Sequence, residues 1–136
     1  MKITVIGSGN GGTAFTGYLT YLGHQVKLFT RTPQKVELYR AQPEINLAGV
    51  VNATVPVGLV TLDMEEAIRG SELIMVATPA NTHKEIATKM APYLKSGQTV
   101  VLNPGRTFGA YEFAHTLESC GCTADVTVAE TDTLVF

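Results

Sequence analysis

The sequence is poor in charged residues and in cysteines, and it has no long apolar run. Ten basic and twelve acidic residues among 136 give a net charge of −2, so there is no basic stripe of the kind that binds nucleic acid or an anionic membrane. The longest apolar runs are strand-sized, such as residues 73–77, and cannot span a bilayer. The first apolar run stops at Gly7, which is too early for a signal peptide. We therefore expect a cytoplasmic protein with no nucleic-acid or membrane partner.

The few residues with metal or redox chemistry are scattered. Cys120 and Cys122 lie one residue apart, and one such pair builds neither a disulfide framework nor a metal site, so we interpret them as reduced structural thiols. His24, His83 and His115 lie on three different segments without the spacing of metal ligands. We interpret the histidines as surface or capping residues and predict no metal site, noting only that His83 follows a loop of interest below.

The apolar content that remains is enough for a folded domain. Forty-five per cent of the residues are apolar, which excludes intrinsic disorder, and a chain of this length folds as one domain without disulfides or metal. The end of the sequence, residues 125–136, reads as a strand followed by more apolar chain, whereas natural domain ends are usually polar. We predict that residues 1–136 are one domain cut from a longer enzyme.

Strand-like and helix-like segments alternate along the chain. Residues 44–60 are less regular because Pro56 and Gly58 interrupt them, and there we expect a small hairpin insertion. The continuous apolar run at 73–77 is typical of a strand buried on both faces of a parallel sheet. Strands are expected over 2–6, 25–29, 59–61, 73–77, 99–102 and 125–129, with helices between them. This order predicts an α/β fold of Rossmann type: a doubly wound parallel sheet of about six strands with helices on both faces.

Helix starts are marked by residue type. Thr32 followed by Pro33 is typical of an N-cap and a first helical position. Asp63 with Glu66, and Thr82 with Glu85, have the spacing of capping boxes. We expect helices to begin at these three points.

The strongest motif is G-x-G-x-x-G directly after the first strand. There Gly7 allows a tight turn, Gly9 lets the backbone approach a pyrophosphate, and Gly12 lets the following helix pack against the sheet. The free N–H groups and the dipole of that helix favour an anion at its start. We predict that a dinucleotide binds at Gly7, Ser8, Gly9, Asn10, Gly11 and Gly12.

The end of the second strand bears on the choice of cofactor. An NAD site usually has Asp or Glu about 20 residues beyond the glycine loop, but the sequence here is Thr30-Arg31-Thr32. Arg31 has the charge and shape to hold a 2′-phosphate, with Thr30 as a hydroxyl donor; alternatively Arg31 is a surface residue or stacks on adenine. We predict NADP or NAD as cofactor, with NADP slightly preferred.

Three further stretches carry a family resemblance: Val76-Ala77-Thr78-Pro79-Ala80, Leu102-Asn103-Pro104-Gly105-Arg106 and Val128-Ala129-Glu130-Thr131. With the glycine loop, they make the chain resemble the N-terminal domain of the NAD(P)-dependent opine dehydrogenases, the octopine and nopaline dehydrogenase family, over nearly its whole length. The first stretch also resembles glycerol-3-phosphate dehydrogenases and ketopantoate reductases.

The resemblance implies further cofactor contacts. Ala77 ends a predicted buried strand, and Thr78 and Pro79 follow it at the carboxyl edge, where open α/β sheets bind ligands, although the proline also simply stops the strand. Asn103 would lie near the nicotinamide or only in a turn, and Glu130 is placed at the cofactor through the resemblance alone. These five residues complete the predicted site.

The resemblance also implies a reaction, in which an amino acid and a 2-keto acid condense and the imine is reduced by hydride from the nicotinamide. In that family the catalytic histidine and the substrate site lie in a second, helical domain. We therefore predict no catalytic residue in this chain, no activity for the chain alone, and the two substrates as partners only together with the missing domain. A homodimer is left open for the full-length protein.

Two other functions fit the same motifs. One keeps the enzyme class but takes glycerol-3-phosphate or ketopantoate chemistry. The other is a stand-alone nucleotide-sensing Rossmann module of the kind that gates potassium transport, which would normally keep an acid after the second strand, where this chain has Arg31.

Overall fold

A six-stranded sheet runs through the middle of the molecule, with every strand parallel to its neighbours. The computed structural model describes residues 1–134, so the last two residues of the apolar tail predicted over 125–136 lie outside the described residues. The strand order is β5-β2-β1-β6-β7-β8. The strands are β1 (Lys2–Ile6), β2 (Gln25–Phe29), β5 (Val60–Thr61), β6 (Leu73–Val76), β7 (Thr99–Leu102) and β8 (Thr127–Glu130). The chain winds outward from β1 on one side and then on the other, which confirms the predicted doubly wound α/β fold.

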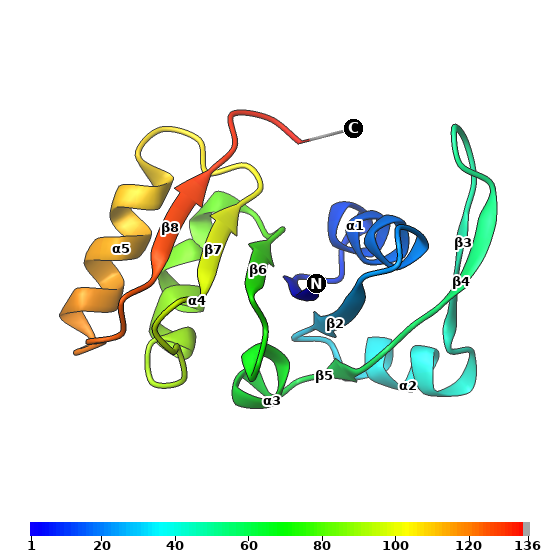
Figure 1. The fold of residues 1–136 in the computed structure, drawn as a ribbon, viewed down its shortest axis with the longest axis horizontal. Helices are drawn as coiled ribbons and strands as arrows, with labels where there is room; N and C mark the ends of the chain where they lie inside the picture. Colours follow the sequence, from blue (N-terminus) through cyan, green and yellow to red (C-terminus); the bar gives the residue numbers. More distant parts are fainter. Residues whose placement is uncertain (135–136) are drawn as a thin grey trace.

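Helices cover both faces of the sheet (Figure 1). They are α1 (Asn10–Tyr21), α2 (Pro33–Ala41), α3 (Met64–Ile68), α4 (His83–Met90) and α5 (Gly109–Ser119), with a short 3-10 turn, η1 (Ala80–Thr82), before α4. Val5 packs with Phe15 of α1 in one core cluster, whereas its neighbour Ile6 packs with Ile86 of α4 in the other. Successive strand residues point to opposite faces, so these apolar strands fill two cores at once.

The predicted insertion is a separate antiparallel hairpin of β3 (Glu44–Leu47) and β4 (Ala53–Pro56). It stands beside α1 on the right of Figure 1. A Cβ on Gly17 of α1 would come within 2.8 Å of Leu47 and 2.9 Å of Ile45, so the missing side chain lets the hairpin pack closely. The interrupting Pro56 is the last residue of β4, opposite Glu44, and the next bond between the two segments comes from the Val57 N–H to the Pro43 carbonyl at 2.9 Å, so no N–H of Pro56 is needed.

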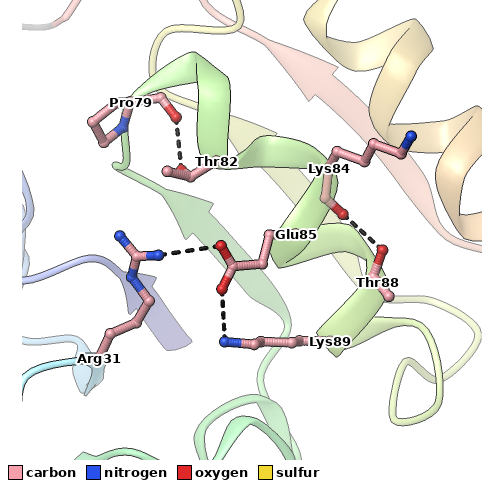
Figure 2. Close-up of polar contacts among 7 residues, drawn as sticks. All are labelled: Arg31, Pro79, Thr82, Lys84, Glu85, Thr88 and Lys89. Carbon is pink, nitrogen blue, oxygen red and sulfur yellow. Dashed lines mark hydrogen bonds and ion pairs between the residues drawn. The ribbon is translucent and has the colours of Figure 1, made fainter.

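One predicted capping box forms by half and the other does not form, since the Glu66 carboxylate accepts from the Thr61 hydroxyl at 2.6 Å and not from the Asp63 N–H. The Asp63 side chain accepts from the Glu66 N–H at 3.1 Å and starts α3. The prediction for Thr82 and Glu85 is wrong: the Thr82 hydroxyl donates to the Pro79 carbonyl at 2.7 Å instead of capping α4. The η1 turn brings that carbonyl within reach of Thr82, and Glu85 is left free to contact other elements (Figure 2).

Within the described part of the chain, no helix combines the length and the apolar character needed to cross a membrane.

Candidate functional site

The predicted site residues gather at one edge of the sheet. Because the strands are parallel, the loops after β1, β2, β6 and β7 leave the sheet at the same edge, and Glu130 ends β8 there. Ile6, the last residue of β1, is paired with Phe29 of β2 and with Val76 of β6. The winding of the chain reverses between β1 and β6, and this reversal is where open α/β sheets bind ligands.

The glycine loop has the geometry that an anion needs. Gly7 has a φ of +110°, which favours glycine, and its N–H donates to the Phe29 carbonyl at 2.9 Å. Gly9 is the N-cap of α1 and has extended backbone, and a Cβ there would meet nothing within 4 Å. A Cβ on Gly12 would overlap the Gly7 carbonyl oxygen. The loop is thus packed on its inner side and open on its outer side.

The start of α1 is free of competing groups. No side chain caps it, and its first turn carries no acidic residue, although a helix of 12 residues has unpaired N–H groups and a positive dipole end there. Asn10 is exposed at this point and Gly11 is partly exposed. The space outside Gly9 and these N–H groups can hold a phosphate or pyrophosphate.

Two hydroxyl groups fasten the glycine loop to the end of β2. The Ser8 and Thr30 hydroxyl oxygens lie 2.7 Å apart, and the Thr32 N–H donates to the Thr30 oxygen at 3.1 Å. Thr30 is buried, with 1% of its surface exposed. The structure therefore uses Thr30 to hold the two loops together, and its predicted contact with the cofactor stays a prediction.

The loop after β6 lies against the glycine loop. A Cβ on Gly7 would come within 2.8 Å of both the Ala77 carbonyl oxygen and the Thr78 methyl group. The Thr78 hydroxyl is buried and has no hydrogen-bond partner within the described structure. An unpaired buried hydroxyl is costly, so its presence beside the glycine loop fits a site where a bound group supplies the missing partner.

His83, the first residue of α4, contacts the backbone of this loop. Its Nε2 lies 3.3 Å from the Thr78 carbonyl oxygen, and only 1% of its surface is exposed. Burial lowers the pKa of the His83 imidazole, against the opposing effects of the Thr78 carbonyl, Glu112 and Glu130. The interpretation of His83 as a surface or capping histidine is wrong, because the residue opens α4 with its ring turned into the core.

Asn103 and Glu130 hold the last loop of this edge in place. Asn103 is buried, and its side-chain amide donates to the Val101 carbonyl at 2.8 Å. The Glu130 carboxylate accepts from the Ala110 N–H at 2.6 Å at the start of α5. A Cβ on Gly105 would overlap the Glu130 side chain. Both residues therefore fix the 103–110 segment, and their contact with a cofactor stays a prediction.

Arg31 meets an acid that the sequence analysis did not anticipate. Its guanidinium lies 3.2 Å from the Glu85 carboxylate, whose other oxygen lies 2.8 Å from the Lys89 ammonium (Figure 2). Glu85 is 54 positions further along the chain and was assigned to a capping box. The signal that could have found it is topological: the start of α4 follows β6, and β6 ends at the same edge as β2, with only β1 between them.

A hollow of about 500 Å³ lies at the opposite edge of the sheet, with Lys27 and Arg69 in its wall. The Lys27 ammonium donates to the carbonyls of Glu66 and Arg69, at 3.1 and 2.6 Å, and Arg69 is paired with Glu65 at 2.8 Å. Desolvation by burial lowers the pKa of Lys27. These two cations are bonded to other groups of the protein, and the glycine loop lies at the other edge, so we place the candidate site at the carboxyl edge.

The cysteines and the possible metal ligands do not form a site of their own within the described residues. Among residues 1–134, no three His, Cys, Asp or Glu side chains are grouped so that they could hold a metal ion. Cys120 and Cys122 are free cysteines at the end of α5.

Comparisons with known proteins show the family of the chain. Residues 2–104 match the family model of the NAD-dependent glycerol-3-phosphate dehydrogenase N-terminus. An opine dehydrogenase of Arthrobacter sp. (strain 1C) is 35% identical over 133 residues, which cover 97% of this chain and 37% of that protein. A glycerol-3-phosphate dehydrogenase [NAD(P)+] of Agathobacter rectalis is 29% identical over 101 residues, 74% of this chain and 30% of that protein.

Among solved structures, an octopine dehydrogenase with NADH and pyruvate superposes with a TM-score of 0.83 at 21% identity, over 98% of this chain and 36% of that one. This likeness confirms the fold. The chain spans about a third of the length of the proteins that it matches.

Proposed function

Because this chain belongs to the family of the NAD-dependent glycerol-3-phosphate dehydrogenase N-terminal domain, we propose that it is the NAD(P)-binding domain of an opine dehydrogenase-like oxidoreductase. The observation that carries the choice within the family is the extent of the match. The family model ends at residue 104, whereas the similarity to the Arthrobacter opine dehydrogenase covers 97% of the chain. That longer match therefore includes most of the residues after 104, among them Gly105 and Glu130.

The residues at the carboxyl edge divide the work of holding a dinucleotide. The uncapped start of α1 offers its N–H groups to the pyrophosphate, and Gly9 leaves the approach open. The buried Thr78 hydroxyl is an unused donor and acceptor beside that approach. The bound cofactor supplies the hydride for reduction of an imine formed from an amino acid and a 2-keto acid. The protein's part at this edge is to bind and to orient.

The test of this function is direct binding. We expect both NADH and NADPH to bind the chain saturably and in a 1:1 ratio in calorimetric titrations, since each carries the same pyrophosphate. Failure of both cofactors to bind would overturn the proposal.

The substrate class is tested in the longest gene product that contains this segment. We expect oxidation of NADH or NADPH that requires an amino acid and a 2-keto acid together. Oxidation with dihydroxyacetone phosphate alone, or with ketopantoate alone, would favour the glycerol-3-phosphate dehydrogenase or ketopantoate reductase alternative. A gene product no longer than this chain that binds nucleotide without turnover would favour the sensing module.

For the chain by itself we expect no dehydrogenase activity. Two titratable side chains assigned to this edge are already engaged by the protein: His83 is buried, and the Glu130 carboxylate is held by the start of α5. A cofactor domain without a substrate site cannot place an imine against the nicotinamide. The measurement is NADPH and NADH oxidation with mixtures of amino acids and 2-keto acids, and robust turnover would show this prediction to be wrong.

Replacement of Arg31 should distinguish the two cofactors. We expect Arg31→Ala to weaken NADPH binding about tenfold and NADH binding less. A hydrogen bond to a charged group contributes about 1.5–3 kcal/mol, and half exposure with an existing partner in Glu85 brings the effect toward the lower end. Titration of both cofactors checks this. Arg40→Ala, which removes an exposed arginine paired with Glu37 on α2, is the control, and equal weakening of both cofactors would contradict a role at the 2′-phosphate.

A further inference from the structure

Arg31, Glu85 and Lys89 form a row of alternating charges across the candidate cofactor edge. Figure 2 shows Glu85 between the two cations, with one carboxylate oxygen toward Arg31 and the other toward Lys89. The two distances are 3.2 and 2.8 Å. Arg31 follows β2, whereas Glu85 and Lys89 belong to α4, which follows β6. The row therefore joins the two halves of the doubly wound sheet.

The Arg31–Glu85 pair crosses the end of β1. Since β1 lies between β2 and β6 and its last residue is paired with both, a contact from the end of β2 to the helix after β6 passes beside the glycine loop. The loop is tied to the same place, because the Ser8 hydroxyl contacts that of Thr30, the neighbour of Arg31. The guanidinium is thus fixed next to the predicted dinucleotide path, on the side of the second strand where the adenosine ribose is read.

Resting on the proposed function, we propose that Glu85 is a specificity-determining residue, which holds the Arg31 guanidinium and thereby shifts the cofactor preference away from NADP and toward NAD. The Glu85 carboxylate and a 2′-phosphate are both anions that a guanidinium binds through the same N–H groups. A cofactor with a 2′-phosphate has to displace Glu85, whereas a cofactor with a free 2′-hydroxyl leaves the pair in place.

Lys89 keeps Glu85 charged and in position. The Lys89 ammonium lies one helical turn from Glu85, and its hydrogen bond lowers the pKa of the Glu85 carboxyl, with Arg31 adding a smaller effect in the same direction. Glu85 is therefore an anion at neutral pH. Because the ammonium is occupied by Glu85, Lys89 gives no free positive charge to the 2′ position while Glu85 is present.

No acid directly follows the second strand, where the sequence is Thr30-Arg31-Thr32. An NAD site usually carries its acid directly after the second strand; here the acid comes from α4 and acts on Arg31. The chain thus has Arg31, which favours binding of a 2′-phosphate, and Glu85, which competes with the phosphate for Arg31.

The test compares Glu85→Gln with a matched control. Glutamine keeps the size of the side chain and removes its charge. Glu65→Gln removes the same charge from another exposed arginine pair, between Glu65 of α3 and Arg69 just after this helix, at 2.8 Å and near the opposite edge of the sheet. NADPH and NADH are titrated calorimetrically into the unchanged chain and into both variants.

We expect Glu85→Gln to tighten NADPH binding about two- to fivefold, the range that exposed ion pairs span, and to leave NADH binding within about 1.5-fold. The control should change neither affinity selectively. In an Arg31→Ala background the gain of Glu85→Gln for NADPH should largely disappear, because the carboxylate then has no guanidinium to withhold.

Three results would overturn the assignment. They are an equal change for both cofactors, the same NADPH gain from Glu65→Gln, and an undiminished gain in the Arg31→Ala background, which would mean that Glu85 acts on the phosphate without Arg31, by direct repulsion or by occupying Lys89. Binding of neither cofactor to the unchanged chain would instead overturn the proposed function. The two failures are therefore distinguishable in one set of titrations.

Discussion

The Gly9→Val variant is expected to keep its fold and to lose dinucleotide binding. Gly9 has a φ of −71° and extended backbone that any residue adopts, and a Cβ at this position would meet no protein atom within 4 Å. The same open space is the approach to the N–H groups of α1, so the branched valine side chain would stand where a pyrophosphate has to lie. We expect affinity for NADH and NADPH to fall at least about a hundredfold, close to 3 kcal/mol.

Calorimetric titration measures this loss, and thermal unfolding followed by circular dichroism serves as its control. Valine is a poorer N-cap than glycine, which costs on the order of 1 kcal/mol or less, so the unfolding midpoint should drop by only a few degrees, about 3–5 °C. Unchanged affinity in a folded variant would disprove the interpretation of the glycine loop as a dinucleotide site.

The inner strands of this fold could be predicted closely from sequence. β1, β2 and β7 have the bounds predicted from the sequence, because their buried positions are filled by apolar side chains that leave a clear pattern. The outer strands were harder. β5 has two residues and β8 begins two residues later than expected, at Thr127, because an edge strand needs fewer apolar residues and leaves a weaker pattern.

The location of the candidate site could also be predicted, since it depends on which loops follow which strands. The roles of individual side chains could not. Thr30 and Glu130 were expected at a cofactor, yet their polar atoms are bonded to Ser8 and to the start of α5. The Arg31–Glu85 pair joins residues 54 positions apart. The spacing of residues within one helix or strand does not predict such a contact, because it depends on the twist and order of the strands.

At Gly12 of the same loop, a substitution should lower the stability of the fold, and this effect should be measurable without a cofactor. Gly12 is buried, and a Cβ would overlap the Gly7 carbonyl oxygen. Gly7 cannot easily move, because its φ is +110° and its N–H is bonded to Phe29. We expect Gly12→Ala to lower the free energy of unfolding by about 2–3 kcal/mol, an overpacking cost that exceeds the gain of about 1 kcal/mol from a better helix former.

Gly11→Ala is the matched control: it lies one residue earlier in α1, its Cβ meets nothing within 4 Å, and it should be as stable as the unchanged chain or more so. Urea unfolding of the three proteins without cofactor measures the difference, and equal stability of the two variants would mean that Gly12 does not pack against the Gly7 backbone.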